Sequence, residues 1–104
     1  MTTNPAGVDL QAEDLAALEV AALALTRIAD IPSAPPQVAL AAFDAVTQLA
    51  SLGVNAGIET GPATVPYLLL LALRELAKLS PTIADHATVA VVRGCCEYAL
   101  REAG

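Results

Sequence analysis

Proline and glycine divide this chain into segments that are rich in alanine and leucine and long enough for one helix each. The clearest breaks are the proline-rich stretch IPSAPP at 31–36 and the stretch GVNAGIETGPAT at 53–64, which contains three glycines. Proline is tolerated only in the first turn of a helix, and glycine often follows its last residue. No segment alternates apolar and polar residues as a strand would. The pattern therefore predicts an all-α chain.

Four helices are expected, packed as one compact domain. In each segment apolar residues recur every three or four positions, which is the period of an amphipathic helix. A chain of 104 residues is long enough to bury one hydrophobic core. We predict a disordered lead over residues 1–8 and a single four-helix bundle-like domain over residues 9–104, with helices at about 9–30, 36–52, 64–79 and 81–102.

Several of these helix ends carry residues that suit them chemically. Asp9 and Thr64 can cap the first and third helices, and Gly53 can end the second. Ser80 and Pro81 have the order of an N-cap followed by proline at the first helical position. The glycines of 53–61 match no phosphate-binding motif, so this stretch is predicted to be a flexible connection, with a small recognition loop as the alternative.

Apolar residues exceed what one small core needs. They make up 56% of the chain, the mean hydropathy is +0.60, and the excess is aliphatic because aromatic residues account for only 3%. This share is above that of a typical soluble domain. The surplus indicates a second buried face, as in an oligomer or a complex.

Charge and segment length argue against two kinds of partner. Five Lys and Arg against eleven Asp and Glu give a net charge of −6, whereas a nucleic-acid binder needs a basic surface. The longest charge-free run that could be helical, 60–73, includes two prolines and is shorter than the roughly 20 apolar residues of a membrane span. The N-terminus lacks the basic-then-apolar order of a signal peptide, so a cytoplasmic location is expected.

Two predicted helices carry apolar residues opposite their main stripe. These candidate interaction residues are Val20 and Leu23 in the first helix, and Tyr67, Leu70 and Leu71 in the third. Two interpretations stay open: each helix contacts two neighbours inside the bundle, or the five residues form an association surface for a second copy or another protein. A helix lying on a membrane surface would carry a more basic polar face.

The main stripes define the expected core. In the second helix the stripe includes Ala42, Phe43 and Leu49, so Phe43 is predicted to be buried. In the last helix the apolar arc includes Val92 and contains both cysteines of the chain, Cys95 and Cys96.

The adjacent cysteines are predicted to be buried core residues, with reversible thiol sensing as the alternative. Neighbouring Cα atoms are about 3.8 Å apart, too close for a disulfide within a regular helix. Cys95 and Cys96 diverge by about 100° on a helix, and His86, the only histidine, points away from both. Neither a zinc site nor a Cys–His nucleophile is therefore expected, and both thiols should react slowly in the native protein.

The charged residues form no catalytic set. Acidic residues near the start of the first helix suit the helix dipole, and basic and acidic residues of the last helix have the spacing of a solvated i,i+4 ladder. His86 is expected to be exposed near a helix start. The acidic residues are Glu13, Asp14 and Glu19, and the ladder is Arg93, Glu97 and Arg101.

Together these observations predict a small acidic helical protein without catalytic residues, metal or cofactor. Its expected function is protein–protein interaction as an accessory, adaptor or regulatory subunit, acting through apolar helix faces and associating as a homodimer. The alternative is a carrier that binds a small apolar ligand within the bundle, although alanine-rich helices pack closely and leave little space for one. The alanine-rich composition is typical of a GC-rich bacterial or phage gene.

Overall fold

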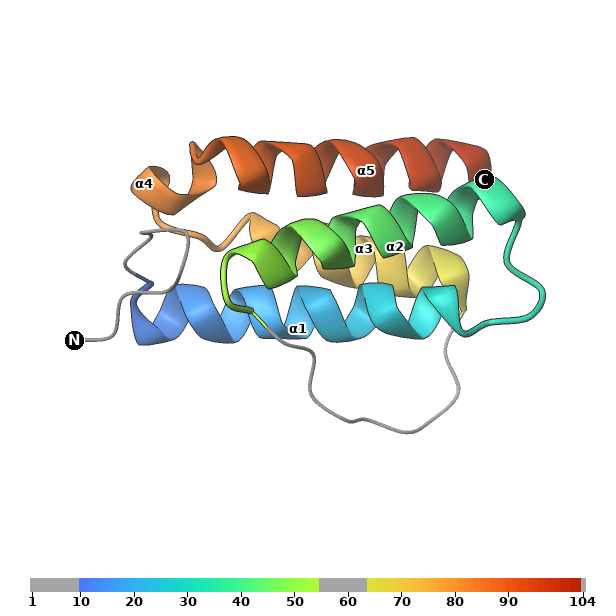
Figure 1. Cartoon of the computed structure of the whole chain (residues 1–104), viewed down its shortest axis with the longest axis horizontal. Coiled ribbons are helices and arrows are strands. Elements are labelled where there is room, and N and C mark those ends of the chain that lie inside the picture. The colour runs from blue at the N-terminus through green and yellow to red at the C-terminus, as the bar shows by residue number, and fades with distance from the viewer. Residues whose placement is uncertain (1–9, 55–63, 104) are drawn as a thin grey trace.

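Four long helices surround one apolar core in the computed structural model, which describes residues 10–54 and 64–103 (Figure 1). The all-α prediction is confirmed, and these residues contain no strand. The expected lead at 1–8 and most of the expected loop at 53–61 lie outside the described residues. The helices are α1 (Ala12–Ala29), α2 (Pro36–Ser51), α3 (Val65–Leu76), the single turn α4 (Pro81–Ala84) and α5 (Ala87–Ala103).

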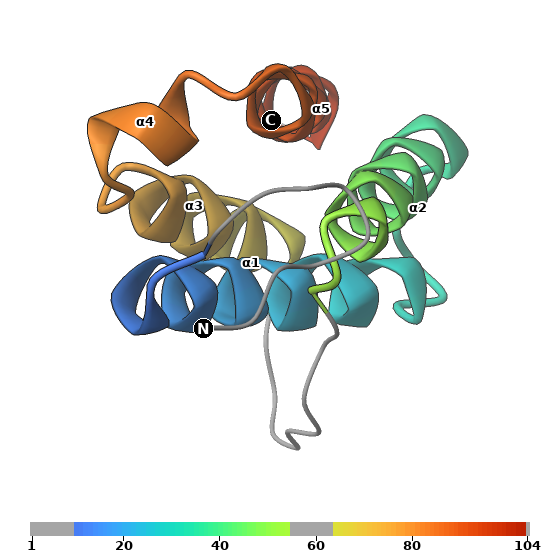
Figure 2. The same cartoon turned by 60° about the vertical axis from the view of Figure 1, so that its left-hand side comes forward.

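Each long helix packs against two others, in the order α1, α2, α5, α3 around the core. Neighbours in this ring run in opposite directions, as Figures 1 and 2 show from two angles. Helices α2 and α3 lie diagonally across the core and run in the same direction, since α2 ends and α3 begins at opposite ends of the molecule. The outer side shared by α1 and α3 is therefore opposite the outer side shared by α2 and α5.

The core is built from small and aliphatic side chains. Nine of the buried residues are alanines, and the largest fully buried side chains are leucine, isoleucine and valine. All three aromatic residues of the chain are exposed: Phe43 at 61%, Tyr67 at 56% and Tyr98 at 41%. Alanine faces let helices approach closely, and a closely packed interior has no space for an aromatic ring.

Phe43 shows where the predicted core of α2 is wrong. The buried stripe of this helix lies one position to the side of the predicted one, and it turns Phe43 away from the core. Ala42 and Leu49 are buried as expected. The helix packs its smallest residues against α1 and α5, so its largest side chain is left outside. The buried residues of α2 are Val38, Ala41, Ala42, Ala45 and Leu49.

Two predicted helix ends are confirmed in detail. Gly53 follows α2 with φ 83°, which glycine adopts without strain. The N–H of Gly53 donates to the Ala50 carbonyl at 2.9 Å and that of Val54 to the Leu49 carbonyl at 3.1 Å, the pairing of a Schellman motif. At the start of α3, the Thr64 hydroxyl accepts from a backbone N–H at 3.3 Å. The described part of α1 begins at Ala12, and Asp9 lies outside the described residues.

The last predicted helix, 81–102, is two helices. Helix α4 ends at Ala84, and α5 begins at Ala87 after a turn at Asp85 and His86. His86 is half-buried rather than exposed, and its Nδ1 accepts a hydrogen bond from the Thr88 N–H at 3.1 Å. This bond satisfies a backbone donor that the first turn of α5 leaves free. The imidazole therefore acts as a cap for α5.

A buried carboxylate joins the start of α1 to the turn after α3. Asp14 is 4% exposed, and its two oxygens accept from the Ser80 N–H at 3.0 Å and the Ser80 hydroxyl at 2.7 Å. Asp14 is therefore a buried structural residue, and its role goes beyond the favourable position near the start of the helix that the sequence predicts. Ser80 precedes α4 as expected, but its side chain forms no cap hydrogen bond with that helix; its hydroxyl donates to Asp14.

Replacing Asp14 by Ala is expected to lower the free energy of unfolding by about 2 to 3 kcal/mol, because two hydrogen bonds to a charged acceptor are lost. Urea denaturation followed by far-UV circular dichroism measures this change. Glu13→Ala is the matched control, because Glu13 shares the first turn of α1 but is exposed; it should change stability by less than about 0.5 kcal/mol. Equal effects of the two substitutions would show that the Asp14–Ser80 contact contributes no stability.

Candidate interaction surfaces

The structure brings together the five residues that the sequence singles out. Val20 and Leu23 of α1 and Tyr67 and Leu71 of α3 line one hollow of about 40 Å³. Leu70 lies beside it in a second hollow of about 370 Å³, shared with Tyr67, Leu71 and Arg74. We call the five predicted residues the α1–α3 surface. They meet because α1 and α3 are neighbours whose outer sides face the same way.

The exposure of these residues divides them into two groups. Val20, Leu23 and Leu71 are half-buried, and Leu71 packs against the core. Leu70 is 55% exposed, similar to Tyr67 on the same helix. Packing between neighbouring helices thus explains why some residues of the surface are apolar. It does not explain Tyr67 and Leu70, which stay largely exposed among the described residues.

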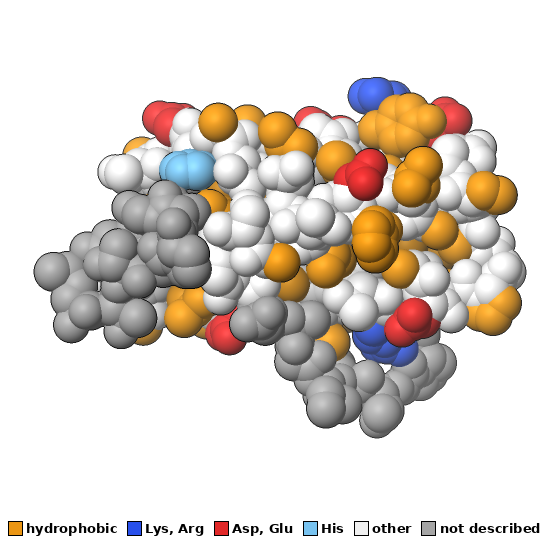
Figure 3. All heavy atoms as spheres, in the orientation of Figure 1, with side chains coloured by type: hydrophobic (Ala, Val, Ile, Leu, Met, Phe, Trp, Pro, Cys, Tyr) orange, Lys and Arg blue, Asp and Glu red, His pale blue; other side chains and the backbone are white. Residues whose placement is uncertain are grey.

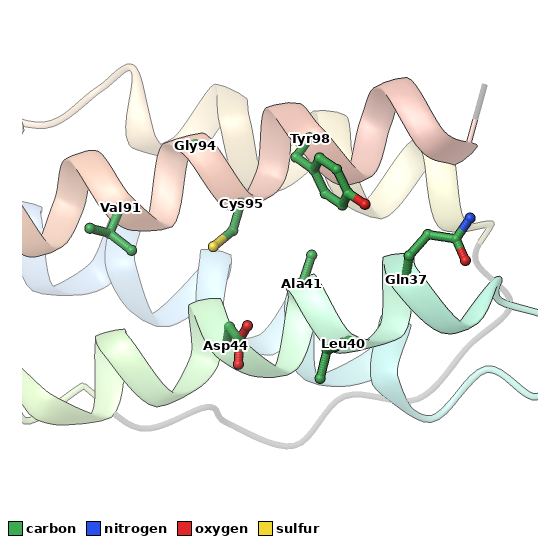
Figure 4. Close-up of a pocket in the computed structure, with 8 residues that line it drawn as sticks. All are labelled: Gln37, Leu40, Ala41, Asp44, Val91, Gly94, Cys95 and Tyr98. Atoms are coloured by element: carbon green, nitrogen blue, oxygen red, sulfur yellow. The ribbon is translucent and has the colours of Figure 1, made fainter.

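A second apolar surface lies on the opposite side of the molecule, and sequence reasoning missed it. It is a groove of about 380 Å³ between the antiparallel helices α2 and α5, which Figure 4 shows from the side. Figure 3 shows apolar side chains distributed over this part of the molecule. We call this site the α2–α5 groove; it is lined by Gln37, Leu40, Ala41 and Asp44 of α2 and by Val91, Gly94, Cys95 and Tyr98 of α5.

A second stripe along α5 could have revealed the groove. The core residues of this helix recur with the spacing of a coiled-coil seam at Val89, Val92, Cys96 and Ala99. Three groove residues, Val91, Cys95 and Tyr98, each precede a core residue by one position, so they form a parallel stripe on the flank of α5. On α2 the predicted stripe pointed the wrong way, because it included Phe43, which is exposed.

The two cysteines have different environments: Cys96 lies in the core as predicted, whereas Cys95 packs against the core without being fully buried. Cys95 also lines the groove, and both residues are free thiols. Burial raises the pKa of Cys96 to about 12, with smaller contributions from Cys95 and Glu97. Burial and the carboxylate of Asp44 raise the pKa of Cys95 as well. Neither thiol is therefore activated as a nucleophile, since thiolate formation is disfavoured at both.

Asp44 is the only charged residue among the eight that line the groove. Its side chain forms no hydrogen bond or ion pair with the described residues. The predicted ladder of the last helix is also not formed, because no ion pair links Arg93, Glu97 and Arg101. These three side chains stay separately solvated, as is common for exposed charges whose pairing is weak in water.

The described residues hold no cluster of three or more His, Cys, Asp or Glu side chains that could bind a metal ion. None of the helices in this part of the chain is both long and apolar enough to cross a membrane. No protein-family model, no curated protein and no solved structure matches this chain. The two apolar surfaces are therefore the features from which function has to be inferred.

In the native protein, Cys95 is expected to react with a thiol reagent faster than Cys96, because only Cys95 reaches the surface. Both should react more slowly than in the unfolded chain. Reagent kinetics on the wild type and on a Cys95→Ser variant would separate the two thiols. Native labelling of Cys96 at the rate of Cys95 would contradict the burial described above.

Proposed function

We propose that this chain is a protein–protein interaction module that associates with a second copy of itself through α3. The observation that carries the proposal is the exposure of Tyr67 and Leu70 in the α1–α3 surface. An aromatic residue and an aliphatic residue, side by side and mostly uncovered, have the chemistry of an interface centre. Of their neighbours, Leu71 packs against the core, and Val20 and Leu23 are half-buried beside it in the hollow between α1 and α3.

The exposed stripe of α3 is suited to pairing with its own copy. The four residues around the larger hollow, Tyr67, Leu70, Leu71 and Arg74, are spaced i, i+3, i+4 and i+7. This order is symmetric about a point between Leu70 and Leu71. In a two-fold symmetric dimer with antiparallel α3 helices, Tyr67 faces Arg74 of the second copy, and Leu70 faces Leu71 of the second copy.

Both contacts of this arrangement are favourable. The Arg74 guanidinium has no ion pair with the described residues, so it is available to stack on the ring of Tyr67 from the second copy. A cation over an aromatic face contributes about 0.5–1 kcal/mol at an exposed site and more when water is removed. The leucines supply the apolar area. The half-buried Val20 and Leu23 extend the same face along α1.

A small apolar ligand, the alternative expectation from the sequence, has weaker support. The hollow between α1 and α3, at about 40 Å³, is far below the roughly 300 Å³ at which ligand pockets begin. The two larger hollows lie on the surface of the molecule, where a ligand would bury little of its own area. A lipid retained on the chain in a native mass spectrum would favour the ligand function instead.

The proposed dimer predicts that Leu70→Glu weakens self-association by about 100-fold, which corresponds to roughly 3 kcal/mol. The reason is that it places an unpaired charge at the centre of an apolar contact. Sedimentation equilibrium over a range of protein concentrations measures the dissociation constant. Because Leu70 is exposed, the variant should retain the fold, which circular dichroism checks.

Leu40→Glu is the matched control for this measurement. Leu40 is 62% exposed, as uncovered as Leu70, but it lies on α2 at the opposite side of the molecule. The control should leave the dissociation constant unchanged. A wild type that stays monomeric at millimolar concentration, or equal effects of the two substitutions, would contradict the proposed α3 interface.

A further inference from the structure

We infer that the α2–α5 groove binds an amphipathic helix of a different protein, which packs against Gly94 and places a lysine or arginine opposite Asp44. The groove is separate from the α1–α3 surface, because the two lie on opposite sides of the ring of helices. The inference therefore does not depend on the proposed dimer, and each can fail without the other.

Gly94 is the first reason to expect a helix in the groove. Glycine in the interior of a helix costs about 0.5–1 kcal/mol relative to alanine. In α5 nothing inside the molecule requires this cost, because a Cβ atom added at Gly94 would meet no atom within 4 Å. The absent side chain leaves an open place on the groove wall. Close approach by the backbone of a partner explains a glycine at this position.

The shape of the groove fits a helix. Small residues, Ala41 of α2 and Gly94 of α5, lie between larger side chains that include Leu40, Val91 and Tyr98 (Figure 4). The groove covers about two turns of each of these antiparallel neighbours, from Gln37 to Asp44 of α2 and from Val91 to Tyr98 of α5. A third helix laid in such a groove inserts apolar residues at i, i+3 or i+4, and i+7.

Asp44 determines the charge that the partner should carry. Its carboxylate is the only charge among the groove residues, and it has no partner in the described structure. Covering an unpaired carboxylate is costly, whereas pairing it with a cation offsets the loss of water. A second copy that presented this same groove would place no lysine or arginine opposite Asp44, because the eight residues that line it include neither, so a basic helix of another protein is the better complement.

The test is a selection from a displayed library of amphipathic helical peptides on the full-length wild-type chain, with counter-selection on Gly94→Leu. The leucine side chain would fill the open place that glycine leaves, so this variant should fold but exclude a helix. Thermal unfolding of Gly94→Leu and of Gly94→Ala confirms that the fold is retained. The Leu70→Glu variant is the matched control, because it changes the opposite surface and should bind the selected peptides as the wild type does.

The expected result is a set of peptides that bind the wild type at least about tenfold more tightly than Gly94→Leu and that carry lysine or arginine beside their apolar stripe. These peptides should not bind the Asp44→Lys variant of the protein. Changing the basic residue of each peptide to glutamate should restore binding to that variant. Peptides that bind wild type and Gly94→Leu equally would overturn the inference, as would selected peptides that are acidic as often as basic. A change in the oligomeric state of Gly94→Leu would instead assign the groove to a second copy and would also overturn it.

Discussion

Close packing of alanine faces between the four long helices is the constraint on which the rest of the structure depends. Nine alanines are buried among the described residues, so the helices approach closely and the interior has no space for a ring. All three aromatic residues are on the outside for this reason. The hydrogen bonds from Ser80 to Asp14 join the start of α1 to the turn after α3.

The function proposed for the molecule follows from where that packing leaves its large side chains. Tyr67 and Leu70 lie on the outer side of α1 and α3, and Tyr98 and Leu40 on the outer side of α2 and α5. These two sides are opposite each other in the ring. A dimer formed through α3 would leave a groove open on each copy, so the assembly would present two binding sites to other proteins. Such an arrangement suits an adaptor, which gains apparent affinity when two sites engage together.

Much of the fold could be predicted from the sequence because its signals are local. Each helix end is determined by residues close to it in sequence. Examples are the prolines of 31–36, the glycine after α2 and the cap at Thr64. The five residues of the α1–α3 surface can be predicted because two helices carry apolar residues on the side opposite their main apolar stripe. The burial of Asp14 could not be predicted, since it depends on Ser80, which is distant in sequence. The α2–α5 groove has a local signal only on α5, because the pairing of α5 with α2 is not visible in either helix alone. Phe43 is misplaced by the sequence pattern because the alanines of this helix fit more than one apolar stripe, and the stripe that is buried does not include Phe43.

The most direct test of this account follows the two tyrosine rings separately by NMR, with labelled tyrosine, as the protein is diluted from millimolar to low micromolar concentration. Tyr67 and Tyr98 lie on opposite sides of the molecule and are both exposed in the single chain. If α3 pairs with its own copy, the ring resonances of Tyr67 will shift with concentration while those of Tyr98 stay constant. Constant resonances for both rings, or a shift confined to Tyr98, would contradict the assignment of the two surfaces.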